Sequence, residues 1–189
     1  MKHYLNDIVE VQSWYYLRTS TDWDVKYLQA KDFNEFGELK WDLVPELNSK
    51  EVQERQYLQD WDILFSAKWT RNFATVYRKE YWKCVASSTF FILRIRDKNT
   101  IPEYLAILLS EATKWKYFKD NISWWYIQTI SKPTLLNYEL EIPPIDKQEK
   151  IIKYYELYKR QARLYDELKE KKEALANQLI LQSNTLNND

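Results

Sequence analysis

Glycine is almost absent from this chain of 189 residues, which contains only Gly37. A protein of average composition has roughly 7% glycine. Phosphate-binding loops that depend on several glycines are therefore excluded, because other residues adopt positive φ only at a steric cost. We expect turns built on asparagine and aspartate, or few tight turns.

Cysteine and histidine are equally scarce, with one residue each at Cys84 and His3. A single cysteine excludes an internal disulfide and a cysteine-based zinc site. Cys84 lies in an apolar run, which favours a buried structural thiol, and His3 is expected to be exposed at a frayed N-terminus. No acidic spacing is typical of a two-metal nuclease centre, so we predict no catalytic residue, no metal and no cofactor.

Net charge and long apolar runs are also missing. The 28 Lys and Arg residues balance 28 Asp and Glu residues. This balance argues against simple polyanion binding, although it leaves room for a local basic face. No window approaches the length of a membrane span or a secretory h-region, which predicts a cytoplasmic protein without a membrane partner.

Tryptophan, in contrast, is abundant, with nine residues. Trp23, Trp41 and Trp61 each precede an aspartate in a turn-like context, where an Asp-Gly type of signal is expected. One interpretation is that these are exposed aromatic residues in loops. The other is that tryptophan stands, in the sequence as written, where a glycine belongs.

The first 145 residues predict a mixed α+β domain of short strands. The candidate strands are β-branched or aromatic and are bounded by polar clusters. They cover residues 8–11, 25–28, 62–66, 74–77, 84–86, 89–95 and 138–142. Helices are predicted at about 101–115, where a proline occupies the first turn, and at 132–137.

One long helix is predicted after Pro143 and Pro144, in a stretch free of glycine and proline that is rich in good helix formers. It would be roughly 50 Å long. Its apolar stripe predicts pairing with a second helix, although a helix lying on its own domain is the alternative. The stripe comprises Ile151, Tyr155, Tyr158, Ala162, Tyr165, Leu168, Leu175 and Leu179. The predicted organisation is therefore an α+β domain over 1–145, a coiled-coil dimerisation helix over 146–183, and a frayed tail over 184–189.

Three polar segments each follow an apolar strand. They combine cations, which suit phosphate or guanine, with amides and hydroxyls that can pair with base edges. The candidate residues are Gln29, Lys31, Ser66, Lys68, Thr70, Arg71, Asn72, Tyr126, Gln128, Thr129 and Lys132. Residue types alone leave open the alternative that all three are ordinary solvated loops.

The order of these segments resembles the DNA-specificity subunits of type I restriction-modification systems. The resemblance spans nearly the whole chain, and its most specific part is a strand, a proline pair and a Gln-Glu pair that opens the long helix. The carrying segments are LNDIV at 5–9, VKYLQAKD at 25–32, WDILFSAKWTR at 61–71, YIQTI at 126–130 and LEIPPIDKQEKI at 140–151.

The resemblance implies a non-catalytic subunit that binds double-stranded DNA. It would direct a methyltransferase subunit, and through it a restriction subunit, to a target site. Lys68 and Arg71 would contact phosphate or guanine, and Lys31 and Lys132 would hold the DNA backbone. Base edges would be read by Asn72, Gln128, Thr129 and Gln29.

Specificity subunits of this family usually carry two recognition domains and two helices, whereas this chain carries one of each. The resemblance therefore implies a half-subunit that forms a homodimer on a two-part site with inverted halves. The alternative is a coiled-coil scaffold or regulatory protein that binds protein partners without DNA.

The tryptophans are the main departure from the family pattern. Where the family has the glycine of a Gly-Asp-Ile-Leu motif, this chain has Trp61, and Trp69 replaces a further glycine. Small residues are also usual at the positions of Trp124 and Trp125. At a position of positive φ, each tryptophan would cost on the order of 1–2 kcal/mol.

Intact-mass measurement of the protein purified from its natural source distinguishes the two interpretations of the tryptophans. We expect a mass that corresponds to glycine at these positions, because several strained tryptophans would consume much of the stability of an ordinary domain. A mass that corresponds to the written sequence would contradict this expectation.

Overall fold

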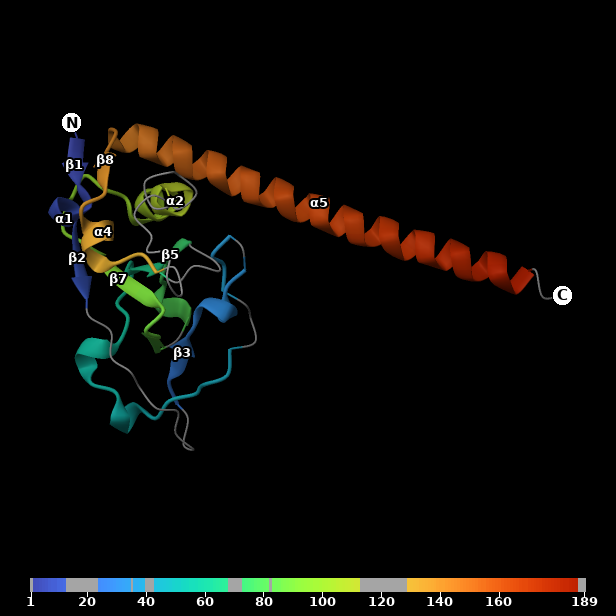
Figure 1. The fold of residues 1–189 in the computed structure, drawn as a ribbon, viewed down its shortest axis with the longest axis horizontal. Helices are drawn as coiled ribbons and strands as arrows, with labels where there is room; N and C mark the ends of the chain where they lie inside the picture. The colour runs from blue at the N-terminus through green and yellow to red at the C-terminus, as the bar shows by residue number, and fades with distance from the viewer. Residues whose placement is uncertain are drawn as a thin grey trace. The chain divides into compact units, whose positions relative to one another are not determined.

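The computed structural model describes residues 2–12, 24–34, 36–39, 43–67, 73–81, 83–112 and 129–186, with side chains described through residue 181. The chain divides into two compact units, residues 1–149 and 150–189. The first unit mixes short strands and helices, and the second continues a long helix (Figure 1). The predicted α+β class with a long C-terminal helix is confirmed.

A four-stranded antiparallel sheet forms the centre of the first unit, with the order β2-β7-β4-β5. Its strands are β2 (Val9–Gln12), β7 (Phe90–Ile95), β4 (Ile63–Ser66) and β5 (Ala74–Val76). All four residues of β4 are buried, because the strand is covered on both faces. Ile63 and Phe65 enter one hydrophobic cluster, and Leu64 enters another.

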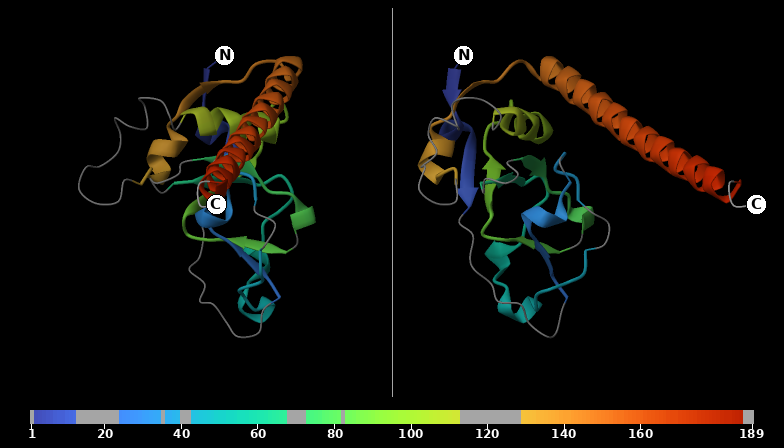
Figure 2. Two further views of the ribbon diagram at one scale, coloured as in Figure 1. Left: turned by 90° about the vertical axis from the view of Figure 1, so that its right-hand side faces the viewer. Right: turned by 45° about the vertical axis from the view of Figure 1, so that its right-hand side comes forward.

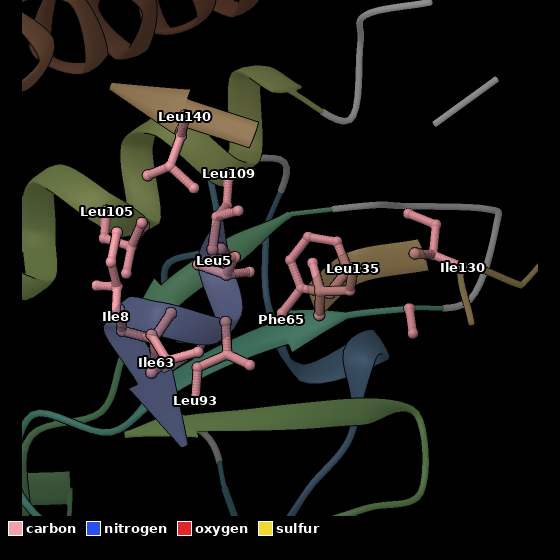
Figure 3. Packing of buried hydrophobic residues seen from close by; sticks show 14 residues of the cluster. Leu5, Ile8, Ile63, Phe65, Leu93, Leu105, Leu109, Ile130, Leu135 and Leu140 are labelled. Carbon is pink, nitrogen blue, oxygen red and sulfur yellow. The ribbon is translucent and has the colours of Figure 1, made fainter. Parts of the chain in front are cut away.

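The first cluster lies between the sheet and three helices, α1 (Leu5–Ile8), α2 (Pro102–Ala112) and α4 (Lys132–Leu136). Figure 3 shows side chains from these helices and from β4 and β7 meeting in one core. Ser110 ties α2 to β5, since its Oγ accepts a hydrogen bond from Ala74 N at 2.9 Å and donates one to Ala74 O at 3.0 Å.

The first unit also contains two sheets of two strands each, and Figure 2 shows the unit from two further sides. In one, β1 (Lys2–Tyr4) pairs antiparallel with β8 (Glu139–Glu141); in the other, β3 (Lys26–Leu28) pairs in parallel with β6 (Cys84–Ala86). The second cluster packs here, with the rings of Phe33 and Phe73 edge-on to Phe90 at 5.6 and 5.9 Å. Such edge-on pairs are favourable because of the ring quadrupole.

The prediction of a buried thiol is confirmed for Cys84, whereas the prediction of an exposed side chain is wrong for His3. Cys84 is buried, as predicted, and burial raises the pKa of its thiol to about 11. His3 was expected to be exposed at a frayed end. It is instead partly buried in β1, where it faces Leu140 of β8.

The predicted elements agree with strands β2 to β8 and with helices α2 and α4, although α2 is described only to Ala112. Sequence analysis missed β1, α1 and four short 3₁₀ helices. These 3₁₀ helices are η1 (Ala30–Asp32), η2 (Ser49–Glu51), η3 (Glu54–Gln56) and η4 (Lys79–Tyr81). A helix of three residues has no hydrophobic period to detect and depends on local contacts, such as Asn48 Oδ1 accepting a hydrogen bond from Lys50 N at 2.9 Å.

The long helix α5 (Ile145–Leu186) begins one residue before and ends three residues after the predicted range. Its first turn is fixed by Gln148, whose side chain is fully buried. The Oε1 atom accepts a hydrogen bond from Ile101 N at 2.8 Å, and Nε2 donates to Asn99 O at 2.6 Å and Pro143 O at 2.8 Å. Within the described residues, no helix has the length and apolar character that a bilayer span requires.

Trp61 occupies a turn position that favours glycine. Asp62 N donates to Gln59 O at 3.0 Å, which closes a four-residue turn with Trp61 in third place. Its φ is 74°, close to the 72° of Gly37. Positive φ at this place in a turn normally requires glycine, so the glycine-like character predicted for this position is confirmed.

The Trp61 side chain partly offsets this backbone strain. Its ring is 45% exposed, and the Arg78 guanidinium lies 3.5 Å from the ring centroid. Arg78 also pairs with Glu103 in the first turn of α2. A cation–π contact at an exposed site contributes about 0.5–1 kcal/mol.

A comparison of Trp61→Gly with Trp61→Ala isolates the backbone strain, since both variants lose the ring contact with Arg78. Urea denaturation should show that the glycine variant exceeds the alanine variant by about 1 kcal/mol in free energy of unfolding. An alanine variant as stable as the glycine variant would show that this turn carries no strain.

Candidate functional site

Several chain segments meet at one edge of the four-stranded sheet. Both β2 and β4 run antiparallel to β7, with Gln12 opposite Ile92 and Ser66 opposite Phe90. The C-terminal ends of β2 and β4 therefore lie beside the N-terminal end of β7. The antiparallel register of β5 brings the start of that strand to the same edge.

Backbone hydrogen bonds outside the strand ladders connect this edge to two further segments. Ala67 N donates to Thr89 O at 3.0 Å, and Ala67 O accepts from Ile130 N at 3.0 Å. Ser87 N donates to Leu28 O at 2.8 Å, which brings the end of β3 alongside. Segments that are far apart in the sequence therefore converge. We call their polar residues the polar edge: Gln29, Lys31, Ser87, Thr89, Thr129 and Lys132.

Gln29 and Lys31 lie in the part of the polar edge that follows β3. Gln29 is partly buried, and its backbone N donates to Asp32 Oδ2 at 2.7 Å, which holds the start of η1. Its Nε2 donates to Glu46 Oε2 at 3.3 Å. Lys31 is exposed on η1. The Gln29 amide is therefore oriented by a carboxylate, while the Lys31 ammonium is at the surface.

Thr129 and Lys132 lie in the part of the polar edge next to β2, and both are exposed. Lys132 is the first residue of α4, and its Nζ donates to Val11 O at 3.4 Å. Ser131 caps this helix, with its Oγ accepting a hydrogen bond from Thr134 N at 3.2 Å. The cap and the contact with β2 hold the lysine at the end of that strand.

Ser66 differs from the other described candidates because it is fully buried at the end of β4. Its side chain therefore does not belong to the surface of the polar edge. The other predicted contacts lie outside the described residues. They are Lys68, Thr70, Arg71, Asn72, Tyr126 and Gln128.

Sequence analysis missed Ser87 and Thr89, which lie between β6 and β7. Their hydroxyl oxygens are 2.6 Å apart, and Thr89 is partly exposed whereas Ser87 is buried. The sequence signal was a run of two serines and a threonine that follows one predicted strand and ends at Thr89, the first residue of the next. This run was overlooked because it is too short to stand out from an ordinary turn.

The polar edge offers hydrogen-bond donors, acceptors and two ammonium groups. Such a set can neutralise phosphates and pair with base edges. Asp32 and Glu46 place negative charge beside Gln29. The positive charge of the polar edge is therefore confined to the surroundings of Lys31 and Lys132. Among the described residues, no cluster of three or more His, Cys, Asp or Glu could hold a metal ion.

A cleft of about 830 Å³ forms a second candidate, lined by His3, Asp7, Asp97, Asn99 and the Pro143–Pro144 pair together with three isoleucines. Its carboxylates are engaged locally. Asp97 Oδ2 accepts from Thr100 Oγ1 at 2.6 Å, and Asp7 Oδ2 accepts from Tyr4 N at 3.2 Å. With acidic groups already bonded to their neighbours, this cleft is less suited to a polyanion than the polar edge.

The fold is similar to those of three solved proteins. One is a chain from a structure described as the structural basis of complex assembly and conformational transition of the type I R-M system. Its TM-score is 0.68 and its sequence identity is 17%, and the match covers 95% of this chain and 43% of that chain. The HsdS subunit from Thermoanaerobacter tengcongensis has a TM-score of 0.58 and 16% identity over 85% of this chain and 37% of that one. The type I restriction-modification S subunit from M. genitalium has a TM-score of 0.59 and 11% identity over 88% of this chain and 41% of that one.

This chain therefore spans less than half the length of each of those three proteins. No curated protein matches the sequence. The family model described as the type I restriction modification DNA specificity domain matches residues 2–174. Because that match covers most of the 189 residues, the chain belongs to the family of type I restriction-modification DNA specificity domains.

Proposed function

We propose that this chain is a sequence-specific DNA recognition subunit that directs a methyltransferase partner, and through it a restriction subunit, to a two-part target. The observation that carries the proposal is the convergence of three polar segments at one sheet edge. Family membership supports DNA as the ligand, and the donors and acceptors of the polar edge suit it.

The two lysines of the polar edge position the DNA. Lys31 and Lys132 are exposed; Lys132 follows Ile130, which bonds to Ala67, and Lys31 follows Leu28, which bonds to Ser87. Contacts of this kind to phosphate fix orientation without reading sequence. Lys68 and Arg71, which stand in the sequence between Ala67 and Phe73, contact phosphate or guanine.

Base edges are read by amides and hydroxyls. Asn72, Gln128, Thr129 and Gln29 supply both donors and acceptors, which suits the major groove, where each base pair shows a distinct pattern. To read a base, Gln29 must release the hydrogen bond that its Nε2 donates to the Glu46 carboxylate and donate to the base instead. Thr70 and Tyr126 complete the set.

The chain itself performs no chemistry in this proposal. The methylation and cleavage reactions belong to partner subunits, and this chain contributes the choice of site. A second copy, paired through α5, would present a second polar edge, so that the target consists of two inverted halves whose spacing depends on the helices.

Alanine substitution of Lys31 and Lys132 tests the polar edge. On duplex DNA, each substitution should weaken binding across sequences and reduce the magnitude of the slope of log K against log salt by about 0.9, the contribution of one phosphate contact. Fluorescence anisotropy at several salt concentrations measures both effects.

Lys98→Ala is the matched control, because Lys98 is exposed beyond the opposite end of β7. It should leave both the affinity and the salt slope unchanged. Equal losses in all three variants would show that binding does not use the polar edge. If the chain binds no DNA and only protein partners, the coiled-coil scaffold is the correct function instead.

A further inference from the structure

Ser87 and Thr89 place two hydroxyl groups in the short turn between β6 and β7. Their oxygen atoms are 2.6 Å apart, which is within the range of an O–H···O hydrogen bond, and either oxygen could be the donor. A hydroxyl carries one proton and two lone pairs. The direction of this bond therefore decides whether Thr89 offers a ligand a donor or only an acceptor.

The backbone of this turn is bonded at every polar group of the two residues. Ser87 N donates to Leu28 O at 2.8 Å, and Ser87 O accepts from Phe90 N at 3.1 Å. Thr89 N donates to Ser87 Oγ at 3.4 Å, and Thr89 O accepts from Ala67 N at 3.0 Å. The two hydroxyls are therefore held by the fold of the recognition unit, as a preorganised contact requires.

Burial decides the direction of the hydroxyl bond. Ser87 is only 4% exposed, and its Oγ already accepts from Thr89 N. Among the described residues, Thr89 Oγ1 is the acceptor within reach of the Ser87 hydroxyl. A buried hydroxyl proton without an acceptor is unfavourable. Ser87 therefore donates to Thr89, because the opposite direction would leave the serine proton without a partner.

Thr89 keeps its own proton for another acceptor as a consequence. Its side chain is partly exposed, so that proton can reach solvent or a ligand. The hydrogen bonds run in one direction, from Thr89 N to Ser87 Oγ and from Ser87 Oγ to Thr89 Oγ1. Hydrogen bonds in such a chain polarise one another, which strengthens the Thr89 hydroxyl as a donor.

This donor lies in the turn that joins the two lysine-bearing parts of the polar edge. Ser87 N bonds to the last residue of β3, which leads to Lys31, and Thr89 O bonds to Ala67, whose carbonyl holds the segment that leads to Lys132. Ammonium groups attract phosphate, whose oxygens only accept hydrogen bonds. A hydroxyl donor suits that anion, whereas outward lone pairs would repel it.

We propose that Thr89 Oγ1 donates a hydrogen bond to an acceptor atom of bound DNA, and that Ser87 is the positioning residue that fixes the direction of this donor. The acceptor is an oxygen of the phosphate backbone or an acceptor on a base edge, such as guanine O6 or thymine O4. The inference rests on the proposed function and deepens it by an uncharged contact between the two lysines.

Two substitutions of Thr89 separate its hydroxyl from its methyl group. Thr89→Val removes the hydroxyl and keeps the shape, whereas Thr89→Ser keeps the hydroxyl. Fluorescence anisotropy of the full chain on several unrelated duplexes of equal length should show about tenfold weaker binding for the valine variant and a change within about twofold for the serine variant. Because the lost group is neutral and releases no counterion, the slope of log K against log salt should stay unchanged.

A valine variant that binds as tightly as the unsubstituted chain would overturn the proposal, and so would an equal loss in the serine variant. A loss shared by all duplexes assigns the contact to phosphate, whereas a loss confined to particular sequences assigns it to a base edge. If the unsubstituted chain binds no duplex, the proposed function fails as well. If it binds and only the valine result fails, this inference alone is wrong.

Ser87→Ala tests the positioning role in a double-mutant cycle with Thr89→Val, and urea denaturation verifies that each variant is folded. Alone, the alanine substitution should weaken DNA binding about threefold, because the Thr89 donor loses its fixed direction. In the Thr89→Val background it should have no further effect. A loss that persists in that background would show that Ser87 acts through the fold, which would overturn its positioning role.

Discussion

The arrangement of the recognition unit depends on the backbone of Ala67. Its N–H donates to Thr89 and its carbonyl accepts from Ile130, so one residue at the end of a fully buried strand connects two distant segments to that strand. β4 can anchor them because hydrophobic clusters cover both of its faces. A rigid strand that ends in a polar edge is what a DNA-reading surface needs, since its side chains are held by elements rather than by loops alone.

Much of the fold could be predicted from the sequence, because β4, β7, α2 and α5 carry strong local signals of apolar runs or helix formers. The pairing of strands could not be predicted, because the parallel contact of β3 with β6 and the bond from Ser87 to Leu28 join distant segments. Ser66 illustrates the same limit. Alternation along a strand predicts one exposed face, whereas a strand covered on both faces buries every residue.

For the candidate site, the sequence offers residue types that suit DNA, but it does not give their geometry. Gln29 is predicted from its residue type to read a base edge, yet its amide donates to the carboxylate of Glu46, seventeen residues away. Trp61 shows the opposite case: a turn signal in the sequence identified a glycine-like position, and φ of 74° confirms it. Turn conformation depends on neighbouring residues and can therefore be predicted from the sequence, whereas side-chain partners depend on the tertiary fold.

The central claim is that the chain chooses the DNA site at which a methyltransferase acts, and that two copies choose it together. Mapping methylated bases on random DNA, made by the methyltransferase partner with and without this chain, tests that claim most directly. We expect methylation at two inverted copies of one half-site with fixed spacing, only when this chain is present. Methylation that is the same with and without the chain would contradict it.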